Sequence, residues 1–195
     1  MGLFNRKNKK EDIIENEMLD ITLHLNMRLM PIDRGSLFED PIDSVLKKYD
    51  LGEVTGGGTL ASKEGMPLSC DIDISIKKSK IENFKSFLHD INTMAKGSYI
   101  EYDGKREDIG SLEGLSLILD GTGLDENVYK ENDINDVIAD IDSLIKGKGE
   151  YHSYYNGEQN TNLYFYGNSF DEMKAIIEEY AKTSPLCENS KIEQI

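Results

Sequence analysis

One stretch in the first half of the chain alternates strictly between apolar and polar side chains, and this limits the folds open to the protein. The alternation runs through Asp71-Ile72-Asp73-Ile74-Ser75-Ile76. Successive side chains of a β-strand point to opposite faces, so this period of two predicts a strand with one buried and one polar face. Three consecutive glycines, Gly56, Gly57 and Gly58, lie in the preceding stretch, which we expect to be the other arm of a hairpin.

The segments around this hairpin predict the order β-α-β-β-α-β. Upstream, residues 23–29 alternate as a strand that Pro31 ends, followed by a polar loop at 33–36 and a helix opened by Asp40-Pro41. Downstream, Ser79 to Glu82 has the spacing of a capping box. It predicts a helix to about residue 96, before a short strand at 98–102. This order is the ferredoxin-like unit, in which the glycine-bearing strand lies at a sheet edge.

The second half repeats this order, largely at an offset of 92 residues. The offset relates strand to strand, helix to helix and final strand to final strand: Leu23, Leu25 and Met27 to Leu115, Leu117 and Leu119; Ile42, Val45 and Leu46 to Ile134, Val137 and Ile138; Ser98, Ile100 and Glu101 to Ser190, Ile192 and Glu193. Gly52-Glu53 corresponds to Gly149-Glu150, and a capping-box spacing recurs at Ser169 to Glu172. An internal duplication explains this pattern.

We therefore predict an α+β protein of two fused ferredoxin-like (βαββαβ) repeats with antiparallel sheets. A flexible or helical N-terminal tail covers residues 1–19, the first repeat 20–103 and the second repeat 112–195. Charge and glycine dominate the connecting residues up to Ser111, which have no periodic apolar pattern and are expected to form a linker.

The strongest global feature is a net charge of -15, from 22 basic and 37 acidic residues. Affinity for nucleic acid comes largely from lysine and arginine, so an acidic chain is not expected to bind DNA or RNA. The same field attracts a basic protein partner.

The cysteines and the apolar stretches indicate the compartment. Cys70 and Cys187 have neither a CxxC spacing nor a histidine cluster and are expected to be buried free thiols. No stretch approaches the roughly 20 apolar residues needed to cross a bilayer. The basic N-terminus lacks the apolar core of a secretion signal. We expect a cytoplasmic protein without a transmembrane segment, a cofactor or a bound metal.

Polar residues on the predicted first sheet form one candidate site. Helices cover one face of a ferredoxin-like sheet, so the other face carries His24, Asn26 and Arg28 from the first strand and Asp71, Asp73 and Ser75 from the third. Such groups could bind a ligand, but cross-strand pairing on a solvated sheet is the more ordinary explanation. Asp71 and Asp73 also have the spacing of a metal-nucleotide pair, which an acidic chain produces easily by chance.

The glycines and the tyrosines are the other candidates. No Gly-Lys-Ser/Thr follows Gly56 to Gly58 and no helix begins there, so Thr55 to Gly58 are interpreted as a bulged or twisted edge strand that another chain could join. Tyrosines crowd the second hairpin, with Tyr154 and Tyr164 as candidates for a partner interface or for self-association into a homo-oligomer, although plain packing of strand tyrosines is the more ordinary explanation. Asp120-Gly121-Thr122-Gly123 is interpreted as a turn.

Several motifs resemble a group of bacterial hypothetical proteins with no established activity. The motifs are Met30-Pro31-Ile32-Asp33-Arg34-Gly35, Phe38-Glu39-Asp40-Pro41, Leu51-Gly52-Glu53-Val54-Thr55-Gly56-Gly57-Gly58-Thr59, Leu112-Glu113-Gly114-Leu115 and Leu119-Asp120-Gly121-Thr122. The resemblance extends from about Asp20 to the end of the chain. It implies a bacterial origin and no catalytic residue.

Two functions remain in competition at this point. The charge, the strand edge and the lack of a convincing catalytic set favour a non-enzymatic acidic protein, of the inhibitor or immunity type, that binds a basic protein. The alternative is a small-ligand-binding protein or hydrolase that uses Asp33, Arg34, Asp71 and Asp73 in a pocket between the repeats.

Overall fold

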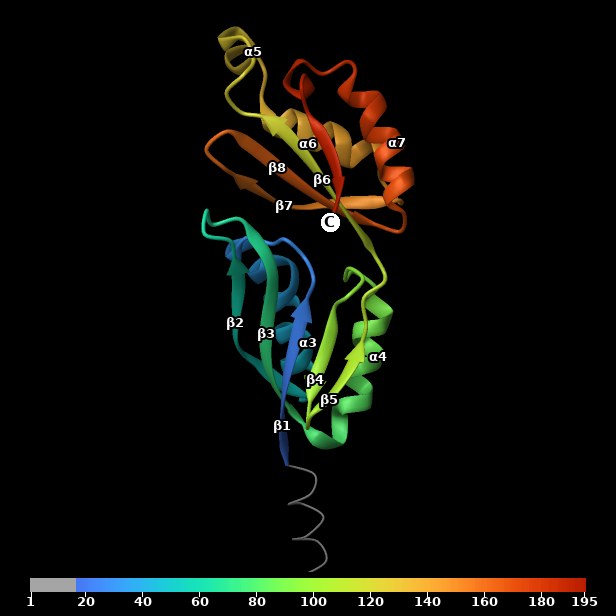
Figure 1. The fold of residues 1–195 in the computed structure, drawn as a ribbon. Coiled ribbons are helices and arrows are strands. Elements are labelled where there is room, and N and C mark those ends of the chain that lie inside the picture. The colour runs from blue at the N-terminus through green and yellow to red at the C-terminus, as the bar shows by residue number, and fades with distance from the viewer. Residues whose placement is uncertain (1–16) are drawn as a thin grey trace, which may run out of the picture.

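The chain forms two βαββαβ units in succession (Figure 1). The computed structural model describes residues 17–195, so nearly all of the expected N-terminal tail lies outside the described residues. The first unit contains β1 (Met18–Leu25), α2 (Pro31–Arg34), η1 (Gly35–Glu39), α3 (Asp40–Lys48), β2 (Gly52–Ala61), β3 (Pro67–Lys77), η2 (Lys78–Lys80), α4 (Ile81–Ile91), β4 (Tyr99–Tyr102) and β5 (Lys105–Asp108). The second contains β6 (Glu113–Asp120), α5 (Glu126–Glu131), α6 (Ile134–Leu144), β7 (Gly149–Asn156), β8 (Asn160–Gly167), α7 (Phe170–Ala181), η3 (Pro185–Cys187) and β9 (Lys191–Gln194).

Both sheets have the ferredoxin-like strand order and are antiparallel. The first runs β2-β3-β1-β4-β5 and the second β7-β8-β6-β9. The predicted α+β fold of two ferredoxin-like repeats is confirmed, with the glycine-bearing β2 at a sheet edge. The alternating stretch is β3, whose isoleucines at 72, 74 and 76 are buried against the helices.

The expected loop at residues 33–36 is wrong, because helix begins at Pro31 and continues to Lys48. Proline is favoured in the first helical turn, where its missing N–H has no helical partner to lose. Asp40 is consequently inside the helix rather than at its N-cap. The wider π-helical turn η1, closed by the Asp40 N–H to the Gly35 carbonyl, precedes Pro41 and accommodates its ring within a continuous helix.

Two other boundaries also differ from the sequence-based expectation. The capping box at Ser79 does not form, because β3 passes directly into the 3-10 turn η2 and Lys80 becomes the N-cap of α4. The helix ends at Ile91, where Asn92 takes a left-handed conformation with φ of 39°. The equivalent box in the second repeat does form, with the Glu172 N–H donating to Ser169 Oγ at 3.3 Å.

The expected linker contains a strand. Residues 105–108 form β5, which pairs with β4 and adds a fifth strand to the first sheet. Asp103 and Gly104 have positive φ and form the tight turn between the two strands. Sequence periodicity could not reveal β5, because four charged residues at a sheet edge have no apolar alternation.

The edge strands β2 and β7 share two backbone features that support the duplication. Each has a bulge, at Thr55 in β2 and at His152 in β7. A helix aspartate accepts the N–H of the preceding residue in both, Val54 to Asp43 at 3.0 Å and Tyr151 to Asp142 at 2.8 Å.

The strand pairings refine the offset between the repeats. Leu117 lies between Leu163 and Ile192 as Leu23 lies between Ile72 and Ile100. The structural partner of Leu23 is therefore Leu117 rather than Leu115. A shift of two residues keeps every side chain on its face, which is why the apolar pattern did not reveal it.

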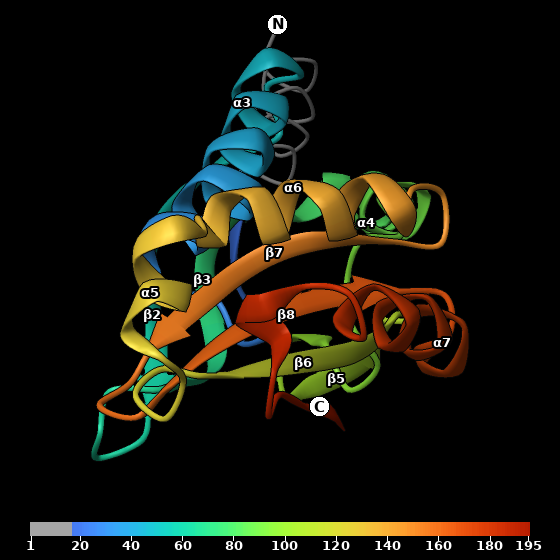
Figure 2. The same cartoon turned by 90° about the horizontal axis from the view of Figure 1, so that it is seen from above.

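The second repeat lies across one end of the first (Figure 1). Its helices form a separate core with β6 and β8, and α6 runs along β7 in the view from above (Figure 2). Its other sheet face contributes Tyr164 and Tyr166 to the core of the first repeat. One repeat thus uses its open face for internal packing, and no other part of residues 17–195 covers the open face of the other.

Candidate functional site

The uncovered face of the first sheet brings together polar residues from four strands. They are Asp20, Thr22 and His24 on β1, Asp71, Asp73 and Ser75 on β3, Tyr99 and Glu101 on β4, and Arg106 on β5. The predicted neighbours on β1 and β3 do lie opposite one another, His24 to Asp71 and Thr22 to Asp73. This set is called the acidic face below.

Two of these pairs are hydrogen-bonded across the strands. His24 Nδ1 lies 2.7 Å from Asp71 Oδ1, and Thr22 Oγ1 donates to Asp73 Oδ1 at 3.2 Å. The Asp71 side chain is still 56% exposed. The cross-strand pairing foreseen for a solvated sheet is present, and it leaves Asp71 with carboxylate surface available to a cation.

An aromatic stack closes one side of the acidic face. The ring of His24 stacks on Tyr99 with centroids 4.6 Å apart, and the Arg106 guanidinium lies 3.6 Å from the centroid of the Tyr99 ring. Arg106 Nε is also 3.5 Å from Asp108 Oδ1. The positive charge of Arg106 is thus already engaged on the protein itself.

A cavity of about 560 Å³ opens on the acidic face beside this stack. Its polar lining includes four carboxylates, Asp20, Asp73, Glu101 and Asp103, and no lysine or arginine among residues 17–195 belongs to the lining. Lys78 lies just outside, 3.9 Å from Asp103 and paired with Glu17 at 2.9 Å. The cavity is a concave surface of one charge sign, which focuses its field on a cationic group.

The sequence indicated this cavity only in part. Asp73 was a candidate, but Asp20 and Glu101 were not, although both follow the same alternation as Thr22 and His24 on their strands. Asp103 could not be found this way, because it lies in the β4–β5 turn that was expected to be a linker.

Two of the three glycines leave the edge of the acidic face without side chains. Gly56 lies opposite Asp73 and Gly58 opposite Asp71. A Cβ added at Gly58 would meet no atom within 4 Å, and one at Gly56 would meet only Asp73 Oδ2 at 3.8 Å. The bulge residue Thr55 lines the cavity. The packing of the fold does not require glycine at positions 56 and 58, and the lack of side chains there leaves this edge of the acidic face open.

Gly57 has a different role, on the opposite side of the sheet. A Cβ there would overlap Glu39 Oε1 and lie 2.9 Å from the Asp71 carbonyl oxygen. Glu39 pairs with Arg34 Nε at 2.8 Å, and Arg34 also donates to Thr59 Oγ1 at 2.8 Å. Gly57 therefore gives this largely buried ion pair the space to cross the edge strand.

The predicted pocket set does not converge on one site. Asp33 accepts a 2.6 Å hydrogen bond from Ser153 Oγ, which in turn accepts the Met30 N–H at 3.0 Å. Arg34 is held by Glu39 and Thr59, whereas the Asp71 and Asp73 side chains lie on the acidic face. Asp33 and Arg34 thus join elements of the fold, and the four residues are divided between two faces of the sheet.

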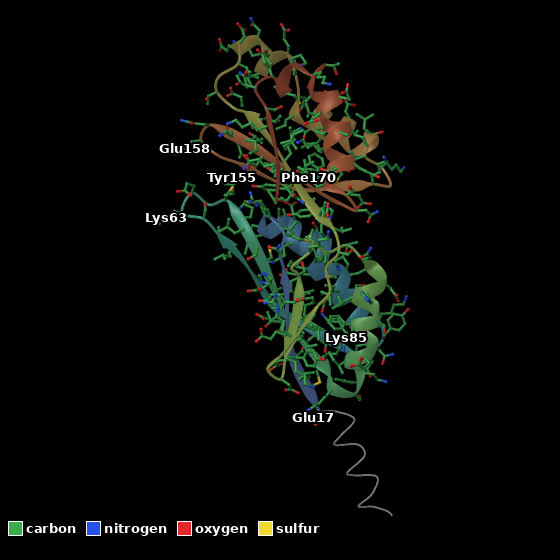
Figure 3. The ribbon with its side chains drawn as sticks, turned by 45° about the vertical axis from the view of Figure 1, so that its right-hand side comes forward. Glu17, Lys63, Lys85, Tyr155, Glu158 and Phe170 are labelled. Atoms are coloured by element: carbon green, nitrogen blue, oxygen red, sulfur yellow. The ribbon has the colours of Figure 1, made fainter. Side chains whose placement is uncertain are left out.

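The tyrosines of the second hairpin mostly hold the repeats together. Tyr164 is fully buried, 5.8 Å from the Arg28 guanidinium, so its prediction as a partner-binding residue is wrong. The Arg28 N–H donates to Tyr166 Oη at 2.6 Å. Figure 3 labels Tyr155 at the boundary between the sheets, near the β2–β3 turn that carries Lys63, and its hydroxyl bonds to the Glu64 carbonyl. Tyr154 alone of the two candidates stays available, with 49% exposure.

The shifted pKa values favour structural roles. Burial raises the pKa of the Cys70 and Cys187 thiols, and both are free and buried as predicted. Burial, aided by the charge of Asp33, raises the pKa of Tyr151 to about 12. Burial lowers the pKa of His152. None of these shifts produces a thiolate or a raised carboxyl pKa of the kind used in catalysis.

A larger cavity, about 720 Å³, lies at the far end of the second repeat. Its lining mixes charges, with Lys130 beside Glu131, and Asp120 is already occupied. Asp120 Oδ1 accepts the N–H groups of Thr122 and Gly123 at 3.0 and 2.7 Å, which hold the pKa of its carboxyl below the ordinary value. The interpretation of residues 120–123 as a turn is confirmed, and this cavity differs from the one on the acidic face in having a lysine, Lys130, beside the carboxylates of Glu131, Asp133, Asp136 and Glu158.

Within residues 17–195, no group of three or more histidine, cysteine, aspartate or glutamate side chains is arranged to hold a metal ion. In the same part of the chain, no helix is long and apolar enough to span a membrane.

Comparison with known proteins gives little further information. No family model matches the chain, and no curated protein matches it. Among solved structures, a mutant chlorite dismutase from Candidatus Nitrospira defluvii matches with 9% sequence identity, over 91% of this chain and 90% of that chain, at a TM-score of 0.31. A score this low carries no argument, so function has to be inferred from the surface itself.

Proposed function

We propose that this chain is a non-enzymatic binding protein, of the inhibitor or immunity type, whose acidic face binds a basic protein partner. The observation that carries the proposal is the cavity on that face, which the described part of the chain lines with Asp20, Asp73, Glu101 and Asp103 and with no lysine or arginine. A cationic side chain entering it would meet several carboxylates at once.

The packing of the two repeats supports this choice of face. In the second repeat the equivalent sheet face carries Ser153, Tyr164 and Tyr166, all buried against the first repeat. In the first repeat the corresponding positions are Gly56, Asp73 and Ser75, and they remain at the surface. The acidic face is therefore the sheet surface that internal packing leaves for another molecule.

The global charge supports the nature of the partner. A net charge of -15 accelerates the approach of a basic protein and disfavours acidic ones. The engaged arginine, Arg106, contributes its charge to Tyr99 and Asp108 rather than to the cavity.

The alternative of a small-ligand protein or hydrolase receives no support from the geometry. Asp33 bonds across the repeat boundary to Ser153, Arg34 bonds to Glu39 within the first repeat, and the two other aspartates lie on the acidic face.

Selection of displayed random peptides against the immobilised protein tests the proposal. We expect enrichment of lysine and arginine, and binding that weakens as salt is raised. Calorimetry of a resynthesised peptide should show at least about tenfold weaker affinity for the double variant Asp71→Asn/Asp73→Asn.

A matched control removes the same charge elsewhere. Asp90→Asn/Glu188→Gln changes two exposed carboxylates away from the acidic face and should leave the affinity within about twofold. Equal weakening by both double variants, or selection of neutral sequences, would contradict the proposal.

A further inference from the structure

We infer that the partner binds as an extended strand added to the outer edge of β2, with basic side chains at alternate positions that cross Gly56 and Gly58 to reach Asp73 and Asp71. The inference rests on the proposed function and specifies how the basic partner is recognised.

The first step is that β2 has an unprotected edge. It is an outer strand of its sheet, and residues 56–61, Gly-Gly-Gly-Thr-Leu-Ala, contain neither a charge nor a proline. Proteins usually protect outer strands with such residues or keep them short. The outer strands β5 and β9 follow this rule, with four residues each and charges on both.

The second step is that hydrogen-bonding groups face outward along this edge. The Val54 N–H points away from β3 to Asp43, which caps the first part of β2. Val54 therefore occupies a non-hydrogen-bonded position opposite Ile74, and antiparallel pairing alternates from one residue of β3 to the next. Asp73 and Asp71 are then the hydrogen-bonded partners of Gly56 and Gly58, whereas Gly57 and Thr59 direct their amide groups outward. An added strand would bond to these two residues.

The third step concerns the side chains of the added strand. Its residues opposite Gly56 and Gly58 would point to the acidic face, two strand spacings or roughly 10 Å from β3. The side chain of a lysine or arginine on the added strand and the side chain of an aspartate on β3 are together long enough to cover this distance. They can meet only if the strand between them has no side chains on that face. Gly58 leaves this path empty, and Asp71 at its end is 56% exposed.

The fourth step concerns the partner residue that lies opposite Leu60, two positions beyond the second basic residue. Leu60 follows on the same face of β2 and is 62% exposed. An apolar residue opposite it would cover its side chain. The expected motif is therefore basic, any residue, basic, any residue, apolar, read in either chain direction because strand addition can be parallel or antiparallel.

Fluorescence anisotropy with labelled synthetic peptides tests the inference. Two probes carry Lys-Val-Lys-Val-Leu and its reverse between threonines. A third probe, made in the chain direction that binds, bears N-methyl groups on both lysines and both valines, which keep the charge and remove the strand hydrogen bonds of parallel and antiparallel addition alike. We expect at least one chain direction to bind, and its N-methylated form to bind at least tenfold more weakly.

A variant on the protein side closes the glycine path. Gly58→Val should weaken binding at least tenfold, whereas Asp90→Asn/Glu188→Gln should not change it. Because a Cβ at residue 58 meets no atom within 4 Å, the variant should fold, and thermal unfolding checks this. Should the variant misfold, the N-methylated peptide against the unchanged protein still decides the question.

The outcomes separate this inference from the proposed function. Equal binding of the methylated and unmethylated peptides would overturn strand addition, and the function would stand if Asp71→Asn/Asp73→Asn still weakened both. Failure of both unmethylated probes to bind, while displayed peptides select basic sequences that need Asp71 and Asp73, would also overturn strand addition alone. Absence of any basic ligand in the selection would overturn the function itself.

Discussion

The edge strands β2 and β7 have the same position, the same bulge and the same hydrogen bond to a helix aspartate in their repeats, yet their functions differ. After the bulge, β7 places Ser153 and Tyr155 toward the first repeat, where they bond to Met30, Asp33 and the Glu64 carbonyl. At the matching positions β2 has Gly56 and Gly58, which pair with β3 and present no side chain to the open face. A duplicated scaffold can thus assign one open face to internal packing and the other to a partner through side chains alone.

The largest effect expected from this comparison separates adjacent glycines. Gly57→Val should destabilise the fold by about 3 kcal/mol, because the new side chain overlaps Glu39 and disrupts its pair with Arg34. Gly58→Val should change the free energy of unfolding by less than about 0.5 kcal/mol. Urea denaturation measures both. Similar losses for the two variants would mean that the glycines serve the fold alike.

The next prediction compares equivalent positions on β8 and β3. Tyr166→Phe should cost about 1.5 kcal/mol, because the partly buried Arg28 N–H loses its 2.6 Å acceptor. Ser75→Ala, at the corresponding place on the acidic face, should cost less than about 0.5 kcal/mol. Thermal unfolding of the two variants would show whether the repeat boundary, and not the acidic face, contributes stability.

The two helix aspartates that accept an edge-strand N–H should contribute equally to stability in both repeats. Asp43→Ala and Asp142→Ala each remove the acceptor of an edge-strand N–H and should each cost about 1 kcal/mol. A loss of unfolding free energy in only one of the two variants would show that the same geometry does not give the same stabilisation in both repeats.

The hydrogen bond between the Val54 N–H and Asp43 should also contribute to the pH dependence of folding stability. Hydrogen bonds from Lys47 and from the Val54 N–H hold the pKa of Asp43 below its ordinary value of 3.8. Its contribution is present above that value and is lost as the pH falls through the lowered pKa. Acid titration of unfolding should show a smaller loss below pH 3.8 in Asp43→Asn than in the wild type.

The smallest effect concerns the bulge residues Thr55 and His152. Burial lowers the pKa of His152 below 6.5, so the unfolded chain takes up its proton first as the pH falls. Stability should therefore decrease from pH 6.5 downward through the lowered pKa. His152→Thr, which copies the bulge residue of β2, should flatten this part of the profile. An unchanged slope would contradict the assignment.

The candidate site could be predicted only where its residues belong to periodic strands. Alternation correctly placed His24, Asp71 and Asp73 on one open face and the glycines on an outer strand. Asp103 and Arg106 escaped, because a short charged hairpin has no apolar period. Tyr164 was misassigned, because a tyrosine on an open sheet face has the same local pattern whether solvent or another repeat covers it.

Local sequence patterns specify the two βαββαβ repeats, since strand and helix periods and their order are local properties that a duplication strengthens. Composition likewise specifies the acidic character of the surface. The folded structure was needed to show which open face is buried, why Gly57 has to be glycine while Gly58 does not, and which carboxylates share a cavity. Those facts depend on contacts between segments far apart in the chain, such as Arg34 and Glu39 with Gly57, or Asp33 with Ser153, and no local pattern encodes them.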